Sequence, residues 1–301
     1  MSTKFVREGM ESDKINDTFY LTDWLTVLHV YKKLKEEEGE LPSETADGKP
    51  LKVWANADTP AEVQKGLGFG CLGVGLYRTE SLFLKTNSLP SEEDQYQEYL
   101  SMVEASEGKQ ITIRTLDLGG DKLLQGWNHE KEANPFMGFR AIRYCLSNPK
   151  IFLAQLQAIL RASAHGNVRI MLPMISGIGE VIRTKELIEE AKSVLDLRKQ
   201  SYDPDIKVGC MIETPAAVAI CDLLAQESDF FCVGTNDLVQ YLLAVDRVNN
   251  EIAFLYEPHH PAVLRSLKKV AEVANEKGLP VTVCGEIAGD PHFLPLLIGL
   301  G

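Results

Sequence analysis

The segment from Thr282 to Pro291 brings together groups that can take part in chemistry. An apolar run ends there on Cys284, and the carboxylates of Glu286 and Asp290 follow among glycines. A strand that opens into a flexible turn beside a thiol and carboxylates is typical of an active-site rim, because an accessible thiol in such a place can react. Cysteine is also among the most buried residue types, so a purely structural role for Cys284 remains open on position alone.

Six earlier apolar runs also end on polar or charged residues, which the packing of a core does not require. The groups at or near these ends are Arg78, Glu80, Arg114, Asp117, Glu213, Asn236 and Asp237. Mg²⁺ takes oxygen ligands, typically one or two carboxylates together with substrate oxygens and waters. Glu213 and Asp237, from neighbouring strand ends, would therefore suffice for one magnesium site. Strand-end carboxylates also cap helices or pair with arginines, so that structural role stays open.

Three arginines are candidates for binding a phosphate group. The guanidinium groups of Arg78, Arg114 and Arg247 can each offer paired hydrogen-bond donors, which suit phosphate oxygens better than an ammonium does. Any one of these arginines alone is more simply explained by a surface ion pair. Together they predict a positive pocket in a chain whose net charge is -12.

Strand-like runs alternate with amphipathic stretches, a pattern typical of parallel α/β architecture. The expected strands are Leu51–Ala57, Gly73–Glu80, Ile111–Leu118, Val168–Ile175, Ile206–Thr214, Phe230–Asp237 and Pro280–Glu286. The expected helices are Ser91–Glu107, Pro149–His165, Ile178–Lys199, Pro215–Glu227 and Pro261–Lys277. Several of the strand runs are apolar throughout, so both faces of the sheet should be covered. The pattern predicts a (β/α)8 TIM-type barrel, in which catalytic side chains gather at the carboxyl ends of the strands.

The ends of the chain predict two further features. Seven strands instead of eight, with the chain stopping at Gly301, predict a barrel that is truncated before its last strand and helix. Residues 1–48 are expected to form a connector, with a helical stretch from Trp24 to Glu38 and a polar link from Gly39 to Gly48. The barrel itself is expected to occupy residues 49–301.

Composition excludes several classes of protein. A chain of 301 residues with 45% hydrophobic and 25% charged content is typical of a globular protein, and its acidic balance disfavours nucleic-acid binding. No apolar run approaches the roughly 20 residues needed to span a bilayer, and the first residues lack a secretory signal, which predicts a cytoplasmic protein. The six cysteines show no Cys-x-x-Cys spacing, so most should be reduced and buried.

Read together, the motifs resemble those of one known family. The segments that carry the resemblance are Gly75-Leu-Tyr-Arg-Thr-Glu80, Arg114-Thr-Leu-Asp-Leu-Gly-Gly-Asp-Lys122, Asn134-Pro-Phe-Met-Gly-Phe-Arg140, Met211-Ile-Glu-Thr-Pro-Ala-Ala217, Gly234-Thr-Asn-Asp-Leu238, Ala244-Val-Asp-Arg247 and Cys284-Gly-Glu-Ile-Ala-Gly-Asp-Pro291. They occur in family order from about residue 50 to the end. The chain resembles the C-terminal phosphoenolpyruvate-binding barrel of enzyme I, the phosphoenolpyruvate-protein phosphotransferase of the bacterial sugar phosphotransferase system.

The resemblance implies a role for each matching residue. It implies that Arg78, Arg114 and Arg247 bind the phosphoryl group of phosphoenolpyruvate and that Glu213 and Asp237 hold Mg²⁺. It also implies that Asp237 lies against the substrate, that Asn236 contacts the substrate beside the metal, and that Cys284 protonates the methylene carbon. Supporting positive positions are implied for Arg140 and Lys122. The family further implies a homodimer and a phosphocarrier partner.

The chain also departs from the family, which leaves other readings open. None of His29, His129, His165, His259, His260 or His292 lies in the sequence context of the family's phosphoryl-accepting histidine, which is expected on a separate N-terminal domain. The barrel of a pyruvate phosphate dikinase or phosphoenolpyruvate synthase shares many of the motifs. A metal-dependent aldolase or lyase could use a similar Glu and Asp pair, although it would not need Cys284 and three phosphate-type arginines. The chain could also serve only to sense phosphoenolpyruvate or to dimerise.

Overall fold

A parallel sheet forms the centre of the molecule, as the computed structural model shows for residues 51–85, 89–118 and 132–300. The expected connector, including the stretch from Trp24 to Glu38, lies outside these described residues and stays a prediction. The strands are β1 (Ala55–Ala57), β2 (Gly73–Arg78), β3 (Gln110–Arg114), β4 (Val168–Leu172), β5 (Lys207–Ile212), β6 (Phe231–Gly234) and β7 (Val281–Cys284). Every neighbouring pair is parallel, and the strands follow one another in chain order from β1 to β7.

The sheet curves into a nearly closed barrel. Its first and last parts approach each other, since β2 and β7 come into contact across the interior. The predicted parallel α/β barrel architecture is therefore confirmed. Each strand in the described residues lies inside a run that the sequence marked, except that β3 begins one residue earlier, at Gln110. The strands are shorter than those runs because the apolar residues continue into buried loops. Leu116 and Leu118, for example, are each 1% exposed beyond the end of β3.

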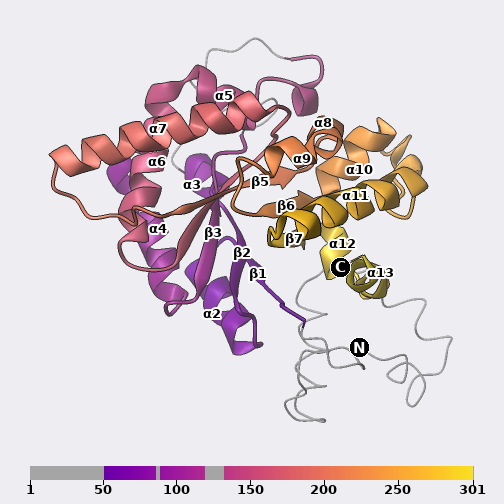
Figure 1. Ribbon diagram of the computed structural model, residues 1–301, viewed down its shortest axis with the longest axis horizontal. Helices are drawn as coiled ribbons and strands as arrows, with labels where there is room; N and C mark the ends of the chain where they lie inside the picture. The colour runs from indigo at the N-terminus through magenta and orange to yellow at the C-terminus, as the bar shows by residue number, and fades with distance from the viewer. Residues whose placement is uncertain (1–50, 86–88, 119–131, 301) are drawn as a thin grey trace.

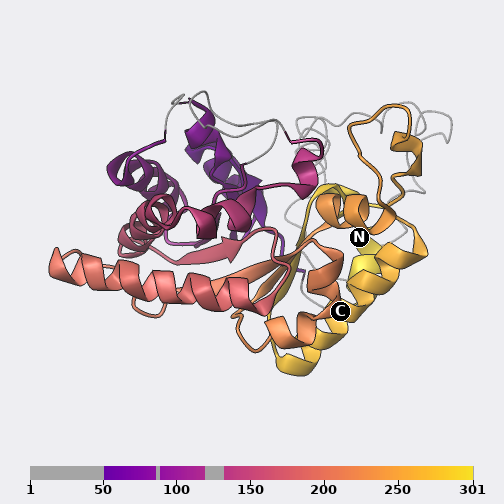
Figure 2. The same ribbon diagram turned by 90° about the horizontal axis from the view of Figure 1, so that it is seen from above.

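Helices cover the outside of the sheet, as both ribbon views show (Figure 1, Figure 2). The α-helices are α2 (Pro60–Gly68), α3 (Glu80–Lys85), α4 (Glu92–Ala105), α5 (Ala141–Ser147), α6 (Pro149–Ser163), α7 (Ile178–Leu197), α8 (Pro215–Ala219), α9 (Cys221–Leu224), α10 (Thr235–Leu243), α11 (Pro261–Lys277), α12 (Glu286–Gly289) and α13 (Leu294–Gly299). Two short 3-10 helices are η3 (Pro135–Met137) and η4 (Ala253–Leu255). The helix expected over Pro215–Glu227 is divided at Ile220 into α8 and α9.

Local sequence signals fix where several helices begin. Thr59, Ser91 and Thr214 accept hydrogen bonds from backbone N–H groups in the first turns of α2, α4 and α8. Proline occupies the first turn of α2, α6, α8 and α11, where its missing N–H has no partner to lose. In residues 51–85, 89–118 and 132–300, none of the helices has both the length and the hydropathy needed to cross a membrane.

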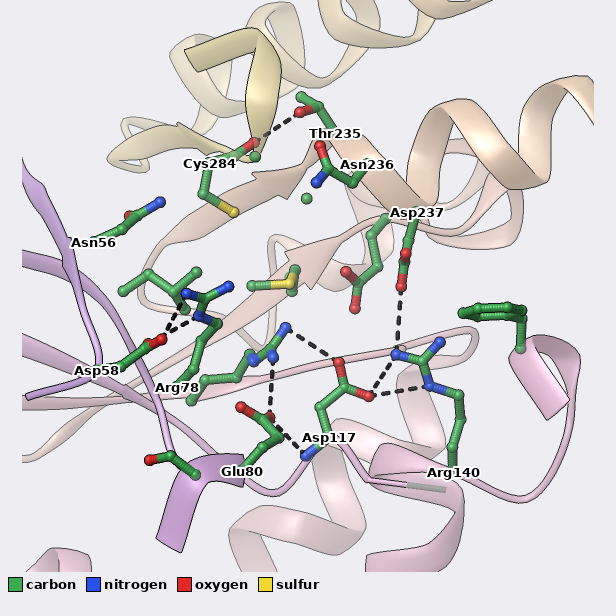
Figure 3. A pocket seen from close by; sticks show the side chains of 18 of the residues that line it. Asn56, Asp58, Arg78, Glu80, Asp117, Arg140, Thr235, Asn236, Asp237 and Cys284 are labelled. Atoms are coloured by element: carbon green, nitrogen blue, oxygen red, sulfur yellow. Dashed lines mark hydrogen bonds and ion pairs between the residues drawn. The ribbon is translucent and has the colours of Figure 1, made fainter. Parts of the chain in front are cut away.

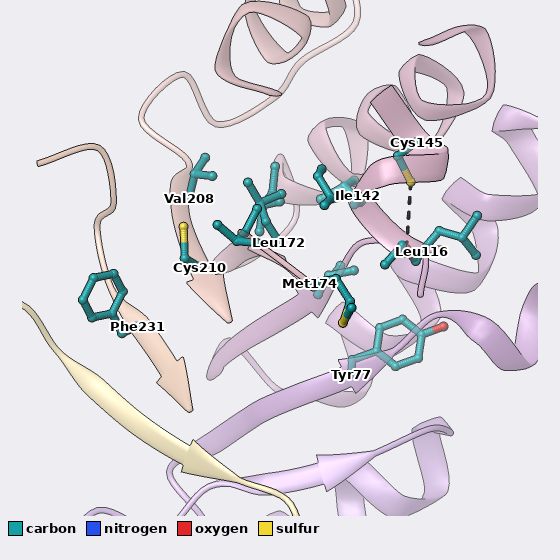
Figure 4. Close-up of a cluster of buried hydrophobic side chains, with 14 of the residues drawn as sticks. Tyr77, Leu116, Ile142, Cys145, Leu172, Met174, Val208, Cys210 and Phe231 are labelled. Atoms are coloured by element: carbon teal, nitrogen blue, oxygen red, sulfur yellow. Dashed lines mark hydrogen bonds between the residues drawn. The ribbon is translucent and has the colours of Figure 1, made fainter. Parts of the chain in front are cut away.

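Alternation along the strands creates two separate apolar cores. On β4, Ile170 and Leu172 face the helices whereas Met171 faces the barrel interior, because successive side chains of a strand point to opposite faces. The outer core includes Tyr77, Leu116, Ile142, Cys145, Leu172, Met174, Val208, Cys210 and Phe231 (Figure 4). The inner core consists of Leu76, Met171, Met211, Phe230, Cys232 and Cys284. The inner core lies directly beneath the functional site.

Candidate functional site

A pocket of about 410 Å³ opens at the carboxyl ends of the strands (Figure 3). Side chains from the ends of β1, β2, β3, β5, β6 and β7 contribute to its wall, together with residues of η3 and α10. All of the sequence-predicted site residues that the structure describes line it: Arg78, Arg114, Arg140, Glu213, Asn236, Asp237, Arg247 and Cys284. Lys122 lies outside the described residues, so its predicted role remains untested.

Arg114 is held at the centre of the pocket by two carboxylates. Its Nη2 donates to Glu80 Oε1 at 2.9 Å, and its Nη1 lies 3.1 Å from Asp117 Oδ2. Burial alone would lower the pKa of Arg114, but Glu80 and Asp117 more than offset burial and raise it. Nε of the same guanidinium is buried without a hydrogen-bond partner among the described groups. Arg114 is therefore firmly cationic and still has one donor to offer to a ligand.

The side chain of Arg140 contacts carboxylates that follow the third and the sixth strands. Its Nη2 donates to Asp117 Oδ1 at 2.7 Å and lies 3.4 Å from Asp237 Oδ2. Burial would lower its pKa, but these two carboxylates raise it. The hydroxyl of Tyr241 accepts from Arg140 Nη1 at 3.4 Å and donates to the carbonyl of Phe136 in η3. Arg140 therefore links Asp237 in α10, through its own contact, with η3 at the border of the pocket, through Tyr241.

The two remaining arginines lie nearer to solvent. Arg78 donates to both oxygens of Asp58 at 2.9 and 2.7 Å, and its side chain is 51% exposed. Arg247 Nη2 lies 3.4 Å from Asp237 Oδ1. Its Nη1 is buried without a partner in the part of the chain that the structure describes. A second unused guanidinium donor thus belongs to a residue that lines the same pocket.

Glu213 is a buried carboxylate at the end of β5. It is 2% exposed, and its Oε1 accepts from the backbone N–H of Met174 at 2.6 Å. Burial, and then the charges of Asp237 and Asp117, raise the pKa of Glu213 to about 8. Room for this carboxylate depends on Gly234, because a Cβ there would lie 2.5 Å from Glu213 Oε2.

The charges of the pocket fit a divalent cation. Its lining carries four arginines, Arg78, Arg114, Arg140 and Arg247, against five carboxylates, Asp58, Glu80, Asp117, Glu213 and Asp237. Within residues 51–85, 89–118 and 132–300 no group of three or more His, Cys, Asp or Glu side chains is arranged to hold a metal by itself. Glu213 and Asp237 can supply two oxygen ligands, and Mg²⁺ usually takes its others from substrate and water. The cation would also offset the repulsion from Asp237 and Asp117, which adds to burial in raising the pKa of Glu213.

Cys284 ends β7 with its sulfur directed into the pocket (Figure 3). Cys284 is 6% exposed, and its thiol donates to the carbonyl of Val233 at 3.5 Å. The neighbouring thiol of Cys232, followed by burial, raises the pKa of Cys284, which favours the neutral thiol. The hydroxyl of Thr235 donates to the Cys284 carbonyl at 2.8 Å and joins the start of α10 to this turn.

The turn after Cys284 requires glycine. Gly285 has a φ of 90°, in the left-handed region, and a Cβ there would meet the side chain of Asn236 at 2.7 Å. Oδ1 of Asn236 instead accepts from the backbone N–H of Glu286 at 2.9 Å. The glycine that follows the thiol therefore lets the ends of β6 and β7 close together beside the pocket.

Sequence reasoning missed part of the site. It noted Glu80 and Asp117 at strand ends without recognising that they hold Arg114, and it did not consider Asp58 or Asn56, which also line the pocket. Asn56 within the first apolar run and Asp58 directly after it were a signal of the same kind as the other strand ends.

Comparison with known proteins gives one consistent result. Residues 32–301 match the family described as "PEP-utilising enzyme, PEP-binding domain". The chain is 46% identical over 274 residues to the phosphoenolpyruvate-protein phosphotransferase of Priestia megaterium, covering 90% of this chain and 48% of the relative. It is 45% identical over 260 residues to the protein of that name from Bacillus subtilis (strain 168), covering 86% of this chain and 46% of the relative. The chain thus spans about half the length of the curated relatives it matches.

Among solved structures, the chain is similar to a HpcH/HpaI aldolase/citrate lyase family protein from Burkholderia cenocepacia J2315. The TM-score is 0.47 at 13% identity, and the match covers 87% of this chain and 86% of that one.

Proposed function

The chain belongs to the family of PEP-utilising enzymes, as their PEP-binding domain, and from that premise we propose that its pocket binds phosphoenolpyruvate and releases pyruvate. The phosphoryl group would pass to a histidine on a separate domain, which is the reaction of a phosphoenolpyruvate-protein phosphotransferase. The observation that carries this proposal is the pair of unused guanidinium donors, Arg114 Nε and Arg247 Nη1, on residues that line a pocket rich in carboxylates. An anionic phosphoryl group would satisfy both donors.

The arginines would bind the phosphoryl group and hold its charge during transfer. Phosphoryl transfer depends almost entirely on positioning and electrostatic stabilisation. Arg114 is fixed by Glu80 and Asp117 before any ligand arrives, so it needs little rearrangement to act. Arg78 is more exposed, so a phosphoryl oxygen can replace Asp58 as its partner at a small cost in free energy.

Glu213 and Asp237 are the residues that would hold Mg²⁺. When bound, the cation stabilises the negative charge of the enolate oxygen and of the substrate carboxylate. Arg140 keeps Asp237 in place through its contact at 3.4 Å, and Met174 does the same for Glu213 through its backbone N–H. Asn236, at the start of α10, borders the same space and would contact the substrate.

Cys284 would supply the proton that completes the reaction. The bond between phosphorus and the enol oxygen breaks, the phosphoryl group bonds to an imidazole nitrogen, and the electron pair stays on the enolate of pyruvate. The methylene carbon then takes the proton of the Cys284 thiol, and the thiolate regains a proton from water. A thiol with a raised pKa is present in the protonated form that this step requires.

The wider setting is proposed from the resemblance to enzyme I. We propose that the phosphoryl group goes on to a phosphocarrier protein in the first step of sugar uptake, and that the protein is cytoplasmic and a homodimer. The names of the curated relatives support the phosphotransferase over the dikinase, synthase and aldolase alternatives. A module that only senses the ligand would not need a proton donor, whereas Cys284, which would donate the proton, lines the pocket.

Exchange of the methyl protons of pyruvate with solvent tests this function on the chain itself. In D₂O with Mg²⁺ and inorganic phosphate, the Cys284 thiolate should remove a methyl proton and return a deuteron, and NMR would record the loss of the methyl signal. We expect exchange that saturates with pyruvate and stops when a chelator removes the metal. Absence of exchange from folded protein would contradict the proposed chemistry.

A further inference from the structure

Gln155 is a buried amide in α6 whose hydrogen bonds reach the ends of two strands. It is 1% exposed and is not among the residues that line the pocket. Its Oε1 accepts from the backbone N–H of Leu116 at 2.9 Å, and its Nε2 donates to Thr79 Oγ1 at 3.3 Å. Thr79 follows β2, and Leu116 follows β3. One side chain from a covering helix therefore holds the carboxyl ends of both strands.

The direction of each hydrogen bond at Gln155 is fixed by its partners. A backbone N–H can only donate, so the atom that faces Leu116 is the amide oxygen and the other atom is the nitrogen. The two N–H groups of that nitrogen are used by Thr79 Oγ1 and by the hydroxyl of Tyr99, at 3.1 Å. A buried amide with all of these partners keeps one orientation, because any turn would leave a buried group unpaired.

The two hydroxyl partners extend this network on both sides. The Thr79 hydroxyl, which accepts from Gln155, donates to the backbone carbonyl of Arg114 at 3.1 Å. The Tyr99 hydroxyl donates to Gln95 Oε1 at 3.1 Å. Tyr99 and Gln95 both belong to α4, and neither is more than 1% exposed. The network therefore runs from α4 and α6 to the main chain of Arg114.

The main-chain groups held in this way lie beside the carboxylates that orient Arg114. Thr79 is followed directly by Glu80 in the chain. Leu116 is followed directly by Asp117. Glu80 Oε1 accepts from Arg114 Nη2 at 2.9 Å and from the backbone N–H of Asp117 at 3.1 Å. The buried amide therefore sets the spacing between the two carboxylates, and with it the place of the guanidinium between them.

Filling space in the core does not require a polar side chain at position 155. Phe152, Leu156 and Ile159, on the same helix, are apolar and at most 1% exposed. Burying an amide among such residues is unfavourable unless its hydrogen bonds are made. The glutamine is therefore explained by the groups that it holds at the strand ends.

We propose that Gln155 is a positioning residue for the phosphoryl group, because it holds the ends of β2 and β3 so that Arg114 presents its guanidinium to the pocket. The inference rests on the proposed function, in which Arg114 binds the phosphoryl group of phosphoenolpyruvate. Arg114 Nε is buried without a partner among the described groups, and its direction follows from the main chain and carboxylates that Gln155 helps to place. Gln155 acts only through Arg114.

Gln155→Met tests this role, since methionine has a similar length and volume but cannot make the hydrogen bonds. We expect the affinity for phosphoenolpyruvate, measured by calorimetry with Mg²⁺, to fall about tenfold because Arg114 is no longer held in one place. The pyruvate concentration for half-maximal methyl exchange, at saturating inorganic phosphate, should stay within about twofold because pyruvate carries no phosphoryl group. A general loosening of the barrel would impair both properties.

Two further variants divide the network. In Gln155→Glu, burial raises the pKa of the new carboxyl group, so at neutral pH it is protonated and offers an acceptor to Leu116 and one hydroxyl donor. This variant should bind phosphoenolpyruvate within about threefold of wild type. Thr79→Val removes only the link between Gln155 and the Arg114 carbonyl and should weaken binding about threefold. It provides the same comparison if Gln155→Met does not fold.

Ser163→Ala is the matched control on the same helix. Ser163 is 5% exposed, and its hydroxyl donates to the carbonyl of Leu160 and accepts from the backbone N–H of Asp203. The variant loses buried hydrogen bonds at the end of α6 that leads into β4, and it should bind phosphoenolpyruvate as wild type does.

Three results would overturn the role of Gln155 alone. They are wild-type affinity in the folded Gln155→Met or Thr79→Val variant, an equal rise in the pyruvate concentration for half-maximal exchange, and an equal loss of affinity in Ser163→Ala. Failure of wild-type protein to bind phosphoenolpyruvate would instead overturn the proposed function, and the role of Gln155 with it.

Discussion

Asp117 accepts two hydrogen bonds from Arg140 through a single carboxylate oxygen, from Nη2 at 2.7 Å and from Nε at 3.1 Å. Its other oxygen lies 3.1 Å from Arg114 Nη1. One buried carboxylate therefore fixes two arginines at the end of the third strand. The cations that would meet the substrate are oriented by the protein itself before the substrate binds.

Replacement of Arg140 tests this arrangement. Arg140→Met removes the partner that Asp117 and Asp237 share and leaves more negative charge beside the substrate. We expect the affinity for phosphoenolpyruvate to fall about 10- to 100-fold, as for loss of a charged hydrogen-bonded pair. Calorimetric titration would measure the affinity. Arg183→Met, which removes an exposed arginine paired with Glu186, is the control and should change little. Equal affinities in the two variants would refute a role for Arg140.

Glu213 should make the metal-free protein sensitive to pH. Its folded-state pKa of about 8 lies above the ordinary 4.5, so the folded state favours the protonated form. The contribution of Glu213 to the free energy of unfolding is fully present below about pH 4.5 and is lost as the pH rises through about 8. At pH 7 the loss is roughly 3 kcal/mol. Glu213→Gln keeps the acceptor for Met174 but cannot ionise, so this part of the loss should disappear.

Thermal unfolding in chelator at about pH 5 and about pH 8 would measure the difference between wild type and Glu213→Gln. Addition of Mg²⁺ should then raise the melting temperature of the wild type but not of the variant. Glu272→Gln, at an exposed site paired with Lys268, is the control. If wild type and Glu213→Gln respond equally to Mg²⁺, Glu213 does not bind the metal.

Gly234 should be intolerant of any side chain. In Gly234→Ala the new Cβ would lie 2.5 Å from Glu213 Oε2 and 2.9 Å from Glu213 Cβ, so Glu213 must move. We expect a loss of about 1–3 kcal/mol in the free energy of unfolding and a weaker response to Mg²⁺. Gly68→Ala is the matched control, because no atom lies within 4 Å of its added Cβ. A wild-type Mg²⁺ response in Gly234→Ala would contradict the site geometry.

Cys284→Ala should separate binding from proton transfer. The arginines and carboxylates remain, so phosphoenolpyruvate should bind within a few-fold of wild type, whereas pyruvate exchange should be lost almost completely. Calorimetry and NMR measure the two properties on the same sample. Cys210→Ala removes a thiol that lies in the outer core beside Ser228, and this variant should keep both binding and exchange. Exchange at the wild-type rate without Cys284 would assign the proton to another group.

The sequence predicted the elements well because apolar runs and first-turn prolines depend on local chemistry. The predicted strands were too long because an apolar run indicates burial and not strand structure. Leu116, for example, is buried but lies in a loop after β3. Strand ends could be recognised as the source of the site, since parallel strands bring their carboxyl ends to one face. The break at Ile220 had no marker as strong as proline or glycine.

Pairings between distant segments could not be predicted. Arg78 and Asp58 belong to different strand–helix units, and their contact depends on the register of β1 against β2. Cys232 was expected to be a core residue, and it is buried as expected. Its position beneath Cys284 depends on the register of β6 against β7, which no local pattern of residues encodes.

Titration of phosphoenolpyruvate into the purified chain by calorimetry, with Mg²⁺ and again with chelator, tests the central claim most directly. Glu213 and Asp237 are the two proposed ligands among the described residues, so Mg²⁺ would take further oxygen ligands from the substrate. The account predicts saturable binding with Mg²⁺ that weakens at least about tenfold in chelator. Equal binding in both conditions, or no binding by protein shown to be folded, would contradict it.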